Sequence, residues 1–219
     1  MEGRVGRYDM VVQKKYIQLD KETLARGLCY LRELDADLDA VVRRLGSPPL
    51  WLRPNTFASL VHIILEQQFS LASARAVFER LTSQLGELMP SAFLSLDDAE
   101  LRSLGFSRQK TRYCRELARA VDRGQLDLLV LERCDDEVVR EQLIEVKGIG
   151  RWTAEIYLLM VLGRPDAWPA GDLAIVRAVR AVKKLDGDPD SAELECLAEA
   201  WRPWRSVAAR VLWLYYLNR

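Results

Sequence analysis

Apolar residues that recur three and four positions apart limit what this chain can fold into. This spacing gives a helix a single buried face. It is found in residues 20–34, 35–45, 57–65, 71–85, 107–121, 135–146, 151–162 and 206–217. Beyond the first twenty residues, no stretch alternates apolar and polar residues as a half-buried strand does. We therefore predict an all-α fold for the 219 residues.

Composition excludes several other classes of protein. The chain is 49% hydrophobic and 29% charged, which argues against a disordered chain or a coiled-coil rod. The longest apolar run, residues 156–162, is far short of the ~20 residues of a membrane span. The first twenty residues lack the apolar core of a secretory signal. We expect a cytoplasmic protein with no membrane partner.

The four cysteines stand far apart, at Cys29, Cys114, Cys134 and Cys196. Neither a zinc knuckle nor a four-cysteine iron–sulfur loop fits this spacing. We therefore expect reduced, mostly buried thiols and no iron–sulfur cluster.

The charges balance overall, with 32 basic and 32 acidic residues, but they are unevenly distributed. Residues 102–123 contain seven basic and two acidic side chains. A neutral protein with a local basic face can hold a phosphate backbone. The same run is equally compatible with an ordinary solvated helix surface.

Residues 143–154, Leu-Ile-Glu-Val-Lys-Gly-Ile-Gly-Arg-Trp-Thr-Ala, join two predicted helices through a short loop. Gly148 and Gly150 allow a tight turn with positive φ and leave the backbone uncovered. The amides at the start of the second helix can then bind a phosphate oxygen. The alternative is a simple helix connection with a glycine at the C-cap.

A lone aspartate, Asp172, follows a Pro/Gly-containing loop and begins another predicted helix. Such an aspartate often serves only as an N-cap. Here it lies twenty-two residues after Gly150. That distance leaves room for one buried helix and a return loop, so the carboxylate can lie near the glycine loop.

These features together resemble the helix–hairpin–helix/GPD superfamily of DNA glycosylases, and in particular its 3-methyladenine DNA glycosylase II type. Residues 64–70 resemble the family's helix end beside the lesion, and residues 201–206 with Trp213 resemble its C-terminal helix. The resemblance covers residues 57–216. It implies a two-lobed helical bundle with the active-site cleft between the lobes.

The resemblance also implies a domain organisation. Residues 51–219 would form the glycosylase core, with the hairpin at 143–154. Residues 1–50 would be an N-terminal extension with helices that pack on the core. They are too few for the β-rich N-terminal domain of that enzyme type, so the chain looks like a short form.

Roles for individual residues follow from the resemblance. Asp172 would be the catalytic carboxylate, acting as a base or as an electrostatic stabiliser. Gln67, Trp152 and Trp213 would line the base pocket, and Gln68 would be the wedge that fills the gap in the duplex. Gly148, Gly150, Arg151 and Thr153 would bind DNA phosphate. The backbone carbonyls of Ile144, Val146 and Ile149 would hold a monovalent cation, sodium or potassium, although no cofactor would be required.

The resemblance implies a monofunctional DNA glycosylase that releases alkylated purines, chiefly 3-methyladenine and also 7-methylguanine, from double-stranded DNA. Superfamily members that also cut the strand have a lysine where this chain has Trp152, and Lys147 does not match that position. The expected protein is a monomer that acts on the nucleoid of a prokaryote. Two alternatives remain: a non-catalytic DNA-binding module, and a glycosylase for oxidised or deaminated bases.

Overall fold

The computed structural model describes residues 16–219, and within that range it contains helices and no strand. The all-α prediction is therefore confirmed. The helices are α1 (Lys21–Leu34), α2 (Ala36–Leu45), α3 (Phe57–Glu66), α4 (Leu71–Leu85), α5 (Pro90–Ser95), α6 (Asp98–Ser103), α7 (Arg108–Asp122), α8 (Leu128–Leu131), α9 (Asp136–Ile144), α10 (Arg151–Ile156), α11 (Leu173–Val182), α12 (Ser191–Glu199) and α13 (Arg205–Leu217). A π-helical segment, η1 (Tyr157–Val161), continues α10. None of the helices in the described part is long and apolar enough to cross a membrane.

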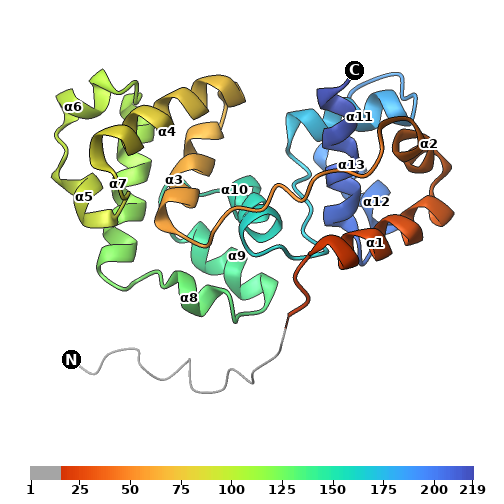
Figure 1. The fold of residues 1–219 in the computed structure, drawn as a ribbon, viewed down its shortest axis with the longest axis horizontal. Helices are drawn as coiled ribbons and strands as arrows, with labels where there is room; N and C mark the ends of the chain where they lie inside the picture. The colour runs from red at the N-terminus through yellow and green to blue at the C-terminus, as the bar shows by residue number, and fades with distance from the viewer. Residues whose placement is uncertain (1–15) are drawn as a thin grey trace.

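The helices form two lobes (Figure 1). In the first lobe, α3 packs against α4 and α7, α5 packs against α7, and α9 packs against α10. In the second lobe, α13 packs against α1, α2 and α11. The second lobe is therefore built from two separate segments of the chain, α1 and α2 before the first lobe and α11–α13 after it. Residue 51 lies in the connection between α2 and α3, where the chain passes from one lobe to the other.

Local sequence fixes where many of the helices begin. Ser107 accepts a hydrogen bond from the amide of Lys110 and caps α7, as the sequence predicts. Asp20 caps α1 in a reciprocal box with Thr23. A buried helix is present over the predicted residues 151–162, but its second half is the π-helical η1 and not α-helical.

Three described chain segments cross between the lobes: one before α1, one between α2 and α3, and one between η1 and α11. The first two are hydrogen-bonded to the end of η1 or the turn after it. The amide of Leu19 donates to the carbonyl of Gly163 at 2.8 Å, and the amide of Arg53 donates to the carbonyl of Met160 at 2.7 Å. These bonds tie the segments before α1 and before α3 to the same short stretch of backbone.

A fully buried arginine, Arg210 of α13, reinforces this junction. Its guanidinium donates to the carbonyls of Leu50 (2.8 Å), Leu159 (2.8 Å) and Ser206 (3.0 Å). Burial lowers the pKa of Arg210 to about 10. One side chain therefore holds the interlobe connection, η1 and α13 together.

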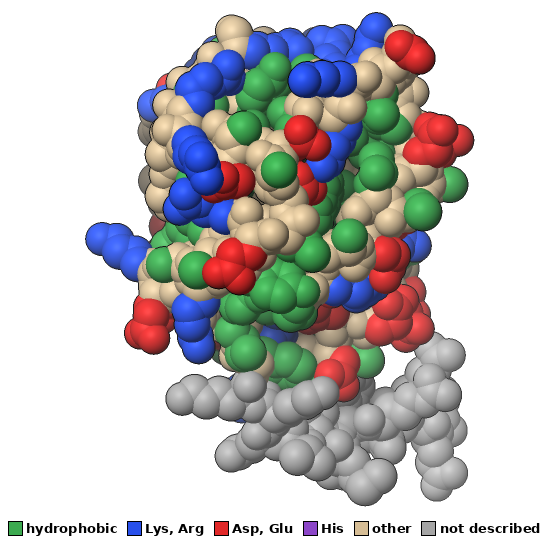
Figure 2. Space-filling view, turned by 90° about the vertical axis from the view of Figure 1, so that its right-hand side faces the viewer, with side chains coloured by type: hydrophobic (Ala, Val, Ile, Leu, Met, Phe, Trp, Pro, Cys, Tyr) green, Lys and Arg blue, Asp and Glu red, His purple; other side chains and the backbone are tan. Residues whose placement is uncertain are grey.

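Figure 2 shows the end of the molecule formed by the second lobe, with Lys and Arg side chains gathered along its upper part. A hollow of about 640 Å³ at the far end of α11 is lined largely by basic side chains. Its residues are Arg177, Arg180, Ala181, Lys184, Leu185, Asp188 and Arg219.

Candidate active site at the lobe junction

The loop between α9 and α10 contains the two glycines that the sequence singled out, and they differ in role. Gly148 has a φ of +99°, and an added Cβ would overlap the ring of Tyr113. Gly150 has a φ of −103° and would have open space around a Cβ. The expectation of positive φ at both positions is wrong, since only Gly148 requires it. The fold itself does not require glycine at position 150.

The start of α10 presents free backbone donors. Gly150 is its N-cap and offers no side-chain cap, so the amides of the first turn have no acceptor within the helix. Arg151, the first residue of α10, is exposed, with a long 3.5 Å contact to Glu195. This loop thus offers backbone amides without a side-chain cap and one exposed guanidinium.

The side chain of Thr153, in contrast, is buried. Only 1% of this residue is exposed, and its Oγ1 accepts a hydrogen bond from Nε2 of Gln67 at 2.8 Å. In this structure the hydroxyl oxygen is bonded within the protein, and the phosphate contact expected of Thr153 stays a prediction.

The basic run at residues 102–123 does not form a uniform basic face. Lys110 is buried, and Arg115 is bound to Asp98 and to the carbonyl of Leu96. Its contribution to a DNA-binding surface is therefore smaller than its formal charge indicates.

Asp172 lies where the two lobes meet and is contacted from both. Its Oδ1 accepts the amides of Ala174 (3.0 Å) and Ile175 (3.1 Å), so it is also the N-cap of α11. The indole of Trp152, on α10, donates to Oδ2 at 3.0 Å. The indole of Trp213, on α13, donates to Oδ1 at 3.2 Å.

This set of partners leaves Asp172 with an uncompensated negative charge. All four donors are neutral, and none of the ion pairs found among residues 16–219 includes its carboxylate. From the described residues, Oδ1 accepts three hydrogen bonds, whereas Oδ2 accepts only the one from Trp152. Oδ2 is therefore the oxygen with free capacity for a further partner.

A third tryptophan, Trp51, adjoins this group and was not singled out from the sequence. Its ring lies 6.2 Å from that of Trp213, centroid to centroid, at an interplanar angle of 72°. Its φ of +49° is unusual for a bulky residue. Trp51 lies in a Pro-rich connection without helical periodicity, so the sequence carried no signal for its position.

Gln67 and Gln68 end the helix α3, but they face different surroundings. Gln67 is the C-cap, and its Nε2 donates to the carbonyl of Gly148 (2.9 Å) and to Thr153. Its amide joins α3 to the hairpin, and the prediction that Gln67 lines the base pocket stays a prediction. Gln68 is exposed and has a φ of +58°.

Comparison with known proteins agrees with this arrangement. The family model described as "HhH-GPD superfamily base excision DNA repair protein" matches residues 61–204, which is more than half of the chain. The chain belongs to the HhH-GPD superfamily. That match spans the end of α3, the hairpin and Asp172.

Individual relatives of this HhH-GPD protein cover most of its length. DNA-3-methyladenine glycosylase 1 of Schizosaccharomyces pombe is 30% identical over 202 residues, which are 87% of each chain. YfjP of Bacillus subtilis is 30% identical over 184 residues; these are 80% of this chain but only 64% of that protein. The chain thus spans less than two thirds of the Bacillus relative.

Solved structures show the same fold. The structure of the S. pombe 3-methyladenine DNA glycosylase Mag1 in complex with abasic DNA superposes with a TM-score of 0.81 at 29% identity. That superposition covers 86% of this chain and 95% of Mag1. A DNA-3-methyladenine glycosidase from Bacillus halodurans gives a TM-score of 0.70 at 31% identity, over 91% of each chain.

Backbone carbonyls beside the hairpin of this HhH-GPD protein offer oxygen ligands. Val146 accepts the amide of Ile149 at 3.0 Å and keeps a second lone pair. No backbone hydrogen bond to the carbonyls of Ile144 or Ile149 is found in the described residues. This donor set is neutral and entirely oxygen, which suits a hard cation of low charge.

Side-chain metal ligands are not gathered elsewhere in residues 16–219. No group of three or more His, Cys, Asp and Glu residues there could hold a metal ion. The four cysteines are unpaired, with Cys114 and Cys134 buried and Cys29 and Cys196 exposed. The expectation of mostly buried thiols is thus correct for only two of them.

Proposed function

We propose that this protein is a monofunctional DNA glycosylase that hydrolyses the N-glycosidic bond of alkylated purines in double-stranded DNA. The chemistry leaves an abasic site for base excision repair. The observation that carries this proposal is the carboxylate of Asp172, which lies at the lobe junction with two indole donors and, within residues 16–219, no basic partner.

Asp172 has the electrostatics that the reaction requires. Cleavage of the glycosidic bond develops positive charge on the sugar, and a nearby anion stabilises that charge. A carboxylate neutralised by Lys or Arg would do this poorly. Oδ2 has lone pairs that are not used by the protein, so it is the oxygen that faces the sugar or orients the attacking water.

Base recognition falls to the tryptophans around Asp172. A base reaches this site only after rotation out of the duplex. N-alkylated purines such as 3-methyladenine and 7-methylguanine are cationic, and a cation over an indole face gains about 0.5–2 kcal/mol. We assign this role to Trp152 and Trp213 and add Trp51, whose ring meets that of Trp213 edge to face.

The same residues favour hydrolysis without strand cleavage. A glycosylase that also cuts the strand needs an amine at the site to form a Schiff base. The position that the strand-cutting relatives fill with lysine is Trp152 here, and its indole is bonded to Asp172. Lys147 precedes the hairpin glycines and lies outside this arrangement.

DNA is held through backbone groups of the hairpin. We assign phosphate binding to the amides that follow Gly148 and Gly150, aided by Arg151, with Thr153 contributing only its amide. The carbonyls of Ile144, Val146 and Ile149 would hold a sodium or potassium ion that adds positive charge beside the phosphate. The reaction requires no other cofactor.

The remaining expectations complete the proposal. Gln68 is exposed at the end of α3 and is the candidate for filling the gap left by the extruded base. The enzyme would act as a monomer on chromosomal DNA, in the nucleoid of a prokaryotic cytoplasm.

The decisive experiment measures release of 3-methyladenine from methylated DNA by the parent protein and by Asp172→Asn. We expect the variant to lose about 100-fold or more in the rate of release, because the charge is removed while the shape is kept. Asp190→Asn is the matched control, since Asp190 also caps a helix by accepting two amides but lies on α12. Its rate should equal that of the parent.

Two results would contradict the proposal. Equal release by Asp172→Asn and the parent would remove Asp172 from the chemistry, and no release by the parent would favour the non-catalytic module. Borohydride treatment should trap no covalent adduct between protein and DNA, and an adduct would show strand-cleaving chemistry. Release of oxidised or deaminated bases in preference to methylated ones would support the other glycosylase class.

A further inference from the structure

A lysine in the basic run is buried beneath the loop that follows α3. Lys110 lies in the first turn of α7 and is 4% exposed. Its ammonium donates to the carbonyls of Ile64 and Gln67 and, at 3.2 Å, to Oε1 of Gln67. Burial lowers its pKa to about 8.

No acidic partner explains this burial. Among residues 16–219, no carboxylate lies within ion-pair distance of the ammonium, and the titratable group facing it is the buried thiol of Cys114. Burial raises the pKa of that thiol to about 12, so it is neutral. A buried ammonium without an anion costs free energy that a methionine in the same place would not. The lysine is therefore better explained by its hydrogen bonds than by packing.

The first effect of these hydrogen bonds is on the end of α3. The last carbonyls of a helix have no N–H donor within the helix, and a cation close to them is stabilising. Lys110 serves this purpose for Ile64 and Gln67. It thereby fixes the point at which the chain leaves α3 and turns into Gln68 with positive φ.

The second effect reaches the hairpin through Gln67. Because Lys110 donates to Oε1, the amide nitrogen Nε2 is directed to the other side, where it donates to the carbonyl of Gly148 and to Thr153. Lys110, Gln67 and the hairpin thus form one continuous hydrogen-bonded chain. It links three segments that are far apart in sequence.

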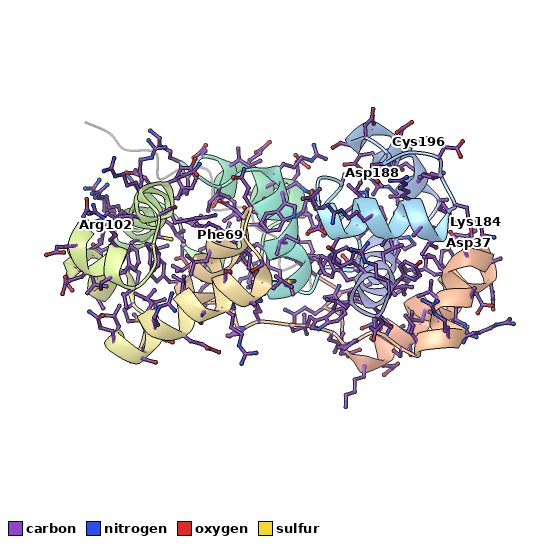
Figure 3. All side chains as sticks on the ribbon, turned by 90° about the horizontal axis from the view of Figure 1, so that it is seen from above. Asp37, Phe69, Arg102, Lys184, Asp188 and Cys196 are labelled. Atoms are coloured by element: carbon purple, nitrogen blue, oxygen red, sulfur yellow. The ribbon has the colours of Figure 1, made fainter. Side chains whose placement is uncertain are left out.

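The loop held in this way presents two exposed side chains. Gln68 is exposed, and Phe69 is 49% exposed although it is aromatic. The Lys110 ammonium lies 5.8 Å from the centroid of the Phe69 ring. Figure 3 labels Phe69, in the loop that joins α3 to α4.

We propose that Lys110 is a positioning residue that fixes the loop carrying Gln68 and Phe69 in register with the phosphate-binding hairpin. The proposal rests on the proposed function, since it requires that this loop enters the duplex. Its consequence is that phosphate binding at the hairpin sets where the loop meets the base stack. Loss of the hydrogen-bonded chain should leave the affinity for duplex DNA unchanged and impair base extrusion.

The test compares Lys110→Met, Gln67→Leu and the double variant with the parent and with Lys21→Met, an exposed lysine on α1. Three quantities are measured: affinity for undamaged duplex, fluorescence of a 2-aminopurine beside an abasic-site analogue, and single-turnover release of 3-methyladenine. We expect Lys110→Met to bind undamaged duplex within about twofold of the parent. Its release rate should fall about 10- to 100-fold, with a matching loss of the unstacking signal.

Gln67→Leu should show the same pattern, and the double variant should be no slower than the slower single variant, because both changes break one chain. The Gln67→Leu variant also keeps the test valid if Lys110→Met fails to fold. The proposal is overturned if Gln67→Leu has the same release rate and unstacking signal as the parent. It is also overturned if the losses of the two single variants multiply in the double variant. If the parent unstacks the duplex but releases no base, the glycosylase assignment fails and the positioning role is still judged by fluorescence.

Discussion

The indole nitrogen of Trp152 lies 3.0 Å from Oδ2 of Asp172 and donates its hydrogen to that oxygen across the junction of the two lobes. Trp152 is contributed by α10, directly after the hairpin, whereas Asp172 begins α11. The bond therefore ties the hairpin proposed to bind DNA to the carboxylate proposed for the chemistry. It also accounts for the orientation of the carboxylate, since Oδ1 is already held by the amides of α11.

Trp152→Phe keeps an aromatic ring but removes this donor. A hydrogen bond to a charged group contributes about 1.5–3 kcal/mol, so we expect base release to slow at least about tenfold. Trp213→Phe should lose less, because Oδ1 keeps two backbone donors. Single-turnover release of 3-methyladenine by both variants measures the difference. Equal losses would show that the hydrogen bond to Oδ2 matters no more to the reaction than the one to Oδ1.

The two hairpin glycines should respond in opposite ways to alanine. Gly148→Ala places a Cβ in the ring of Tyr113 at positive φ, and we expect a loss of about 2–4 kcal/mol in unfolding free energy. Gly150→Ala meets open space within the protein and should fold as the parent does. Its Cβ would lie where phosphate approaches, so DNA affinity should fall about 5- to 10-fold. Urea unfolding and duplex titration separate the two effects, and unchanged affinity in Gly150→Ala would argue against phosphate contact there.

Substitution of Trp51 should change the choice of base more than the rate of the reaction itself. With Trp51→Leu, release of cationic 3-methyladenine should fall by up to about tenfold relative to release of neutral hypoxanthine. Trp204→Leu provides the comparison, because Trp204 is the N-cap of α13 and its ring packs against Gly27 of α1. If the ratio of the two release rates is the same in Trp51→Leu and in the parent, Trp51 has only a packing role.

The stability of the second lobe should depend on pH through Asp35. Burial alone would raise the pKa of this carboxyl, but hydrogen bonds from Lys183 and Trp201 lower it overall. A lowered pKa means that the carboxylate contributes stability above its ordinary value near 4 and loses it as the pH falls through the folded-state pKa. Asp35→Asn should cost about 2–4 kcal/mol at pH 7. Urea unfolding at pH 7 and pH 3 should show this difference shrinking at the lower pH, and a constant difference would rule out the ionised form as its source.

The sequence was sufficient for the longer α-helices and for the approach of Asp172 to the hairpin, but not for the short helices α5 and α8 or for η1. Helical periodicity and capping residues such as Ser107 act locally, so they can be interpreted without a structure. The association of Trp152 and Trp213 with the carboxylate was expected from family resemblance, but their donation to separate oxygens was not. That detail depends on how α10 and α13 approach α11.

Other features could not be predicted, because they depend on contacts between distant segments. Lys110 stands in a run of basic residues that looks solvated, and only the packing of α7 under α3 buries it. Gln67 and Thr153 have polar side chains that look available to a ligand, yet they bond to each other. Trp51 lies in a connection whose path is set by Arg210, at the other end of the chain.

Two of the three interlobe segments are hydrogen-bonded to η1 and its following turn, and this limits how the two lobes can move around DNA. With Leu19 and Arg53 bonded to that backbone and Arg210 buried behind it, a hinge motion would have to break several hydrogen bonds at once. We therefore expect the protein to act as a stiff template. The duplex, being the softer partner at a damaged step, would kink to bring its lesion to Asp172.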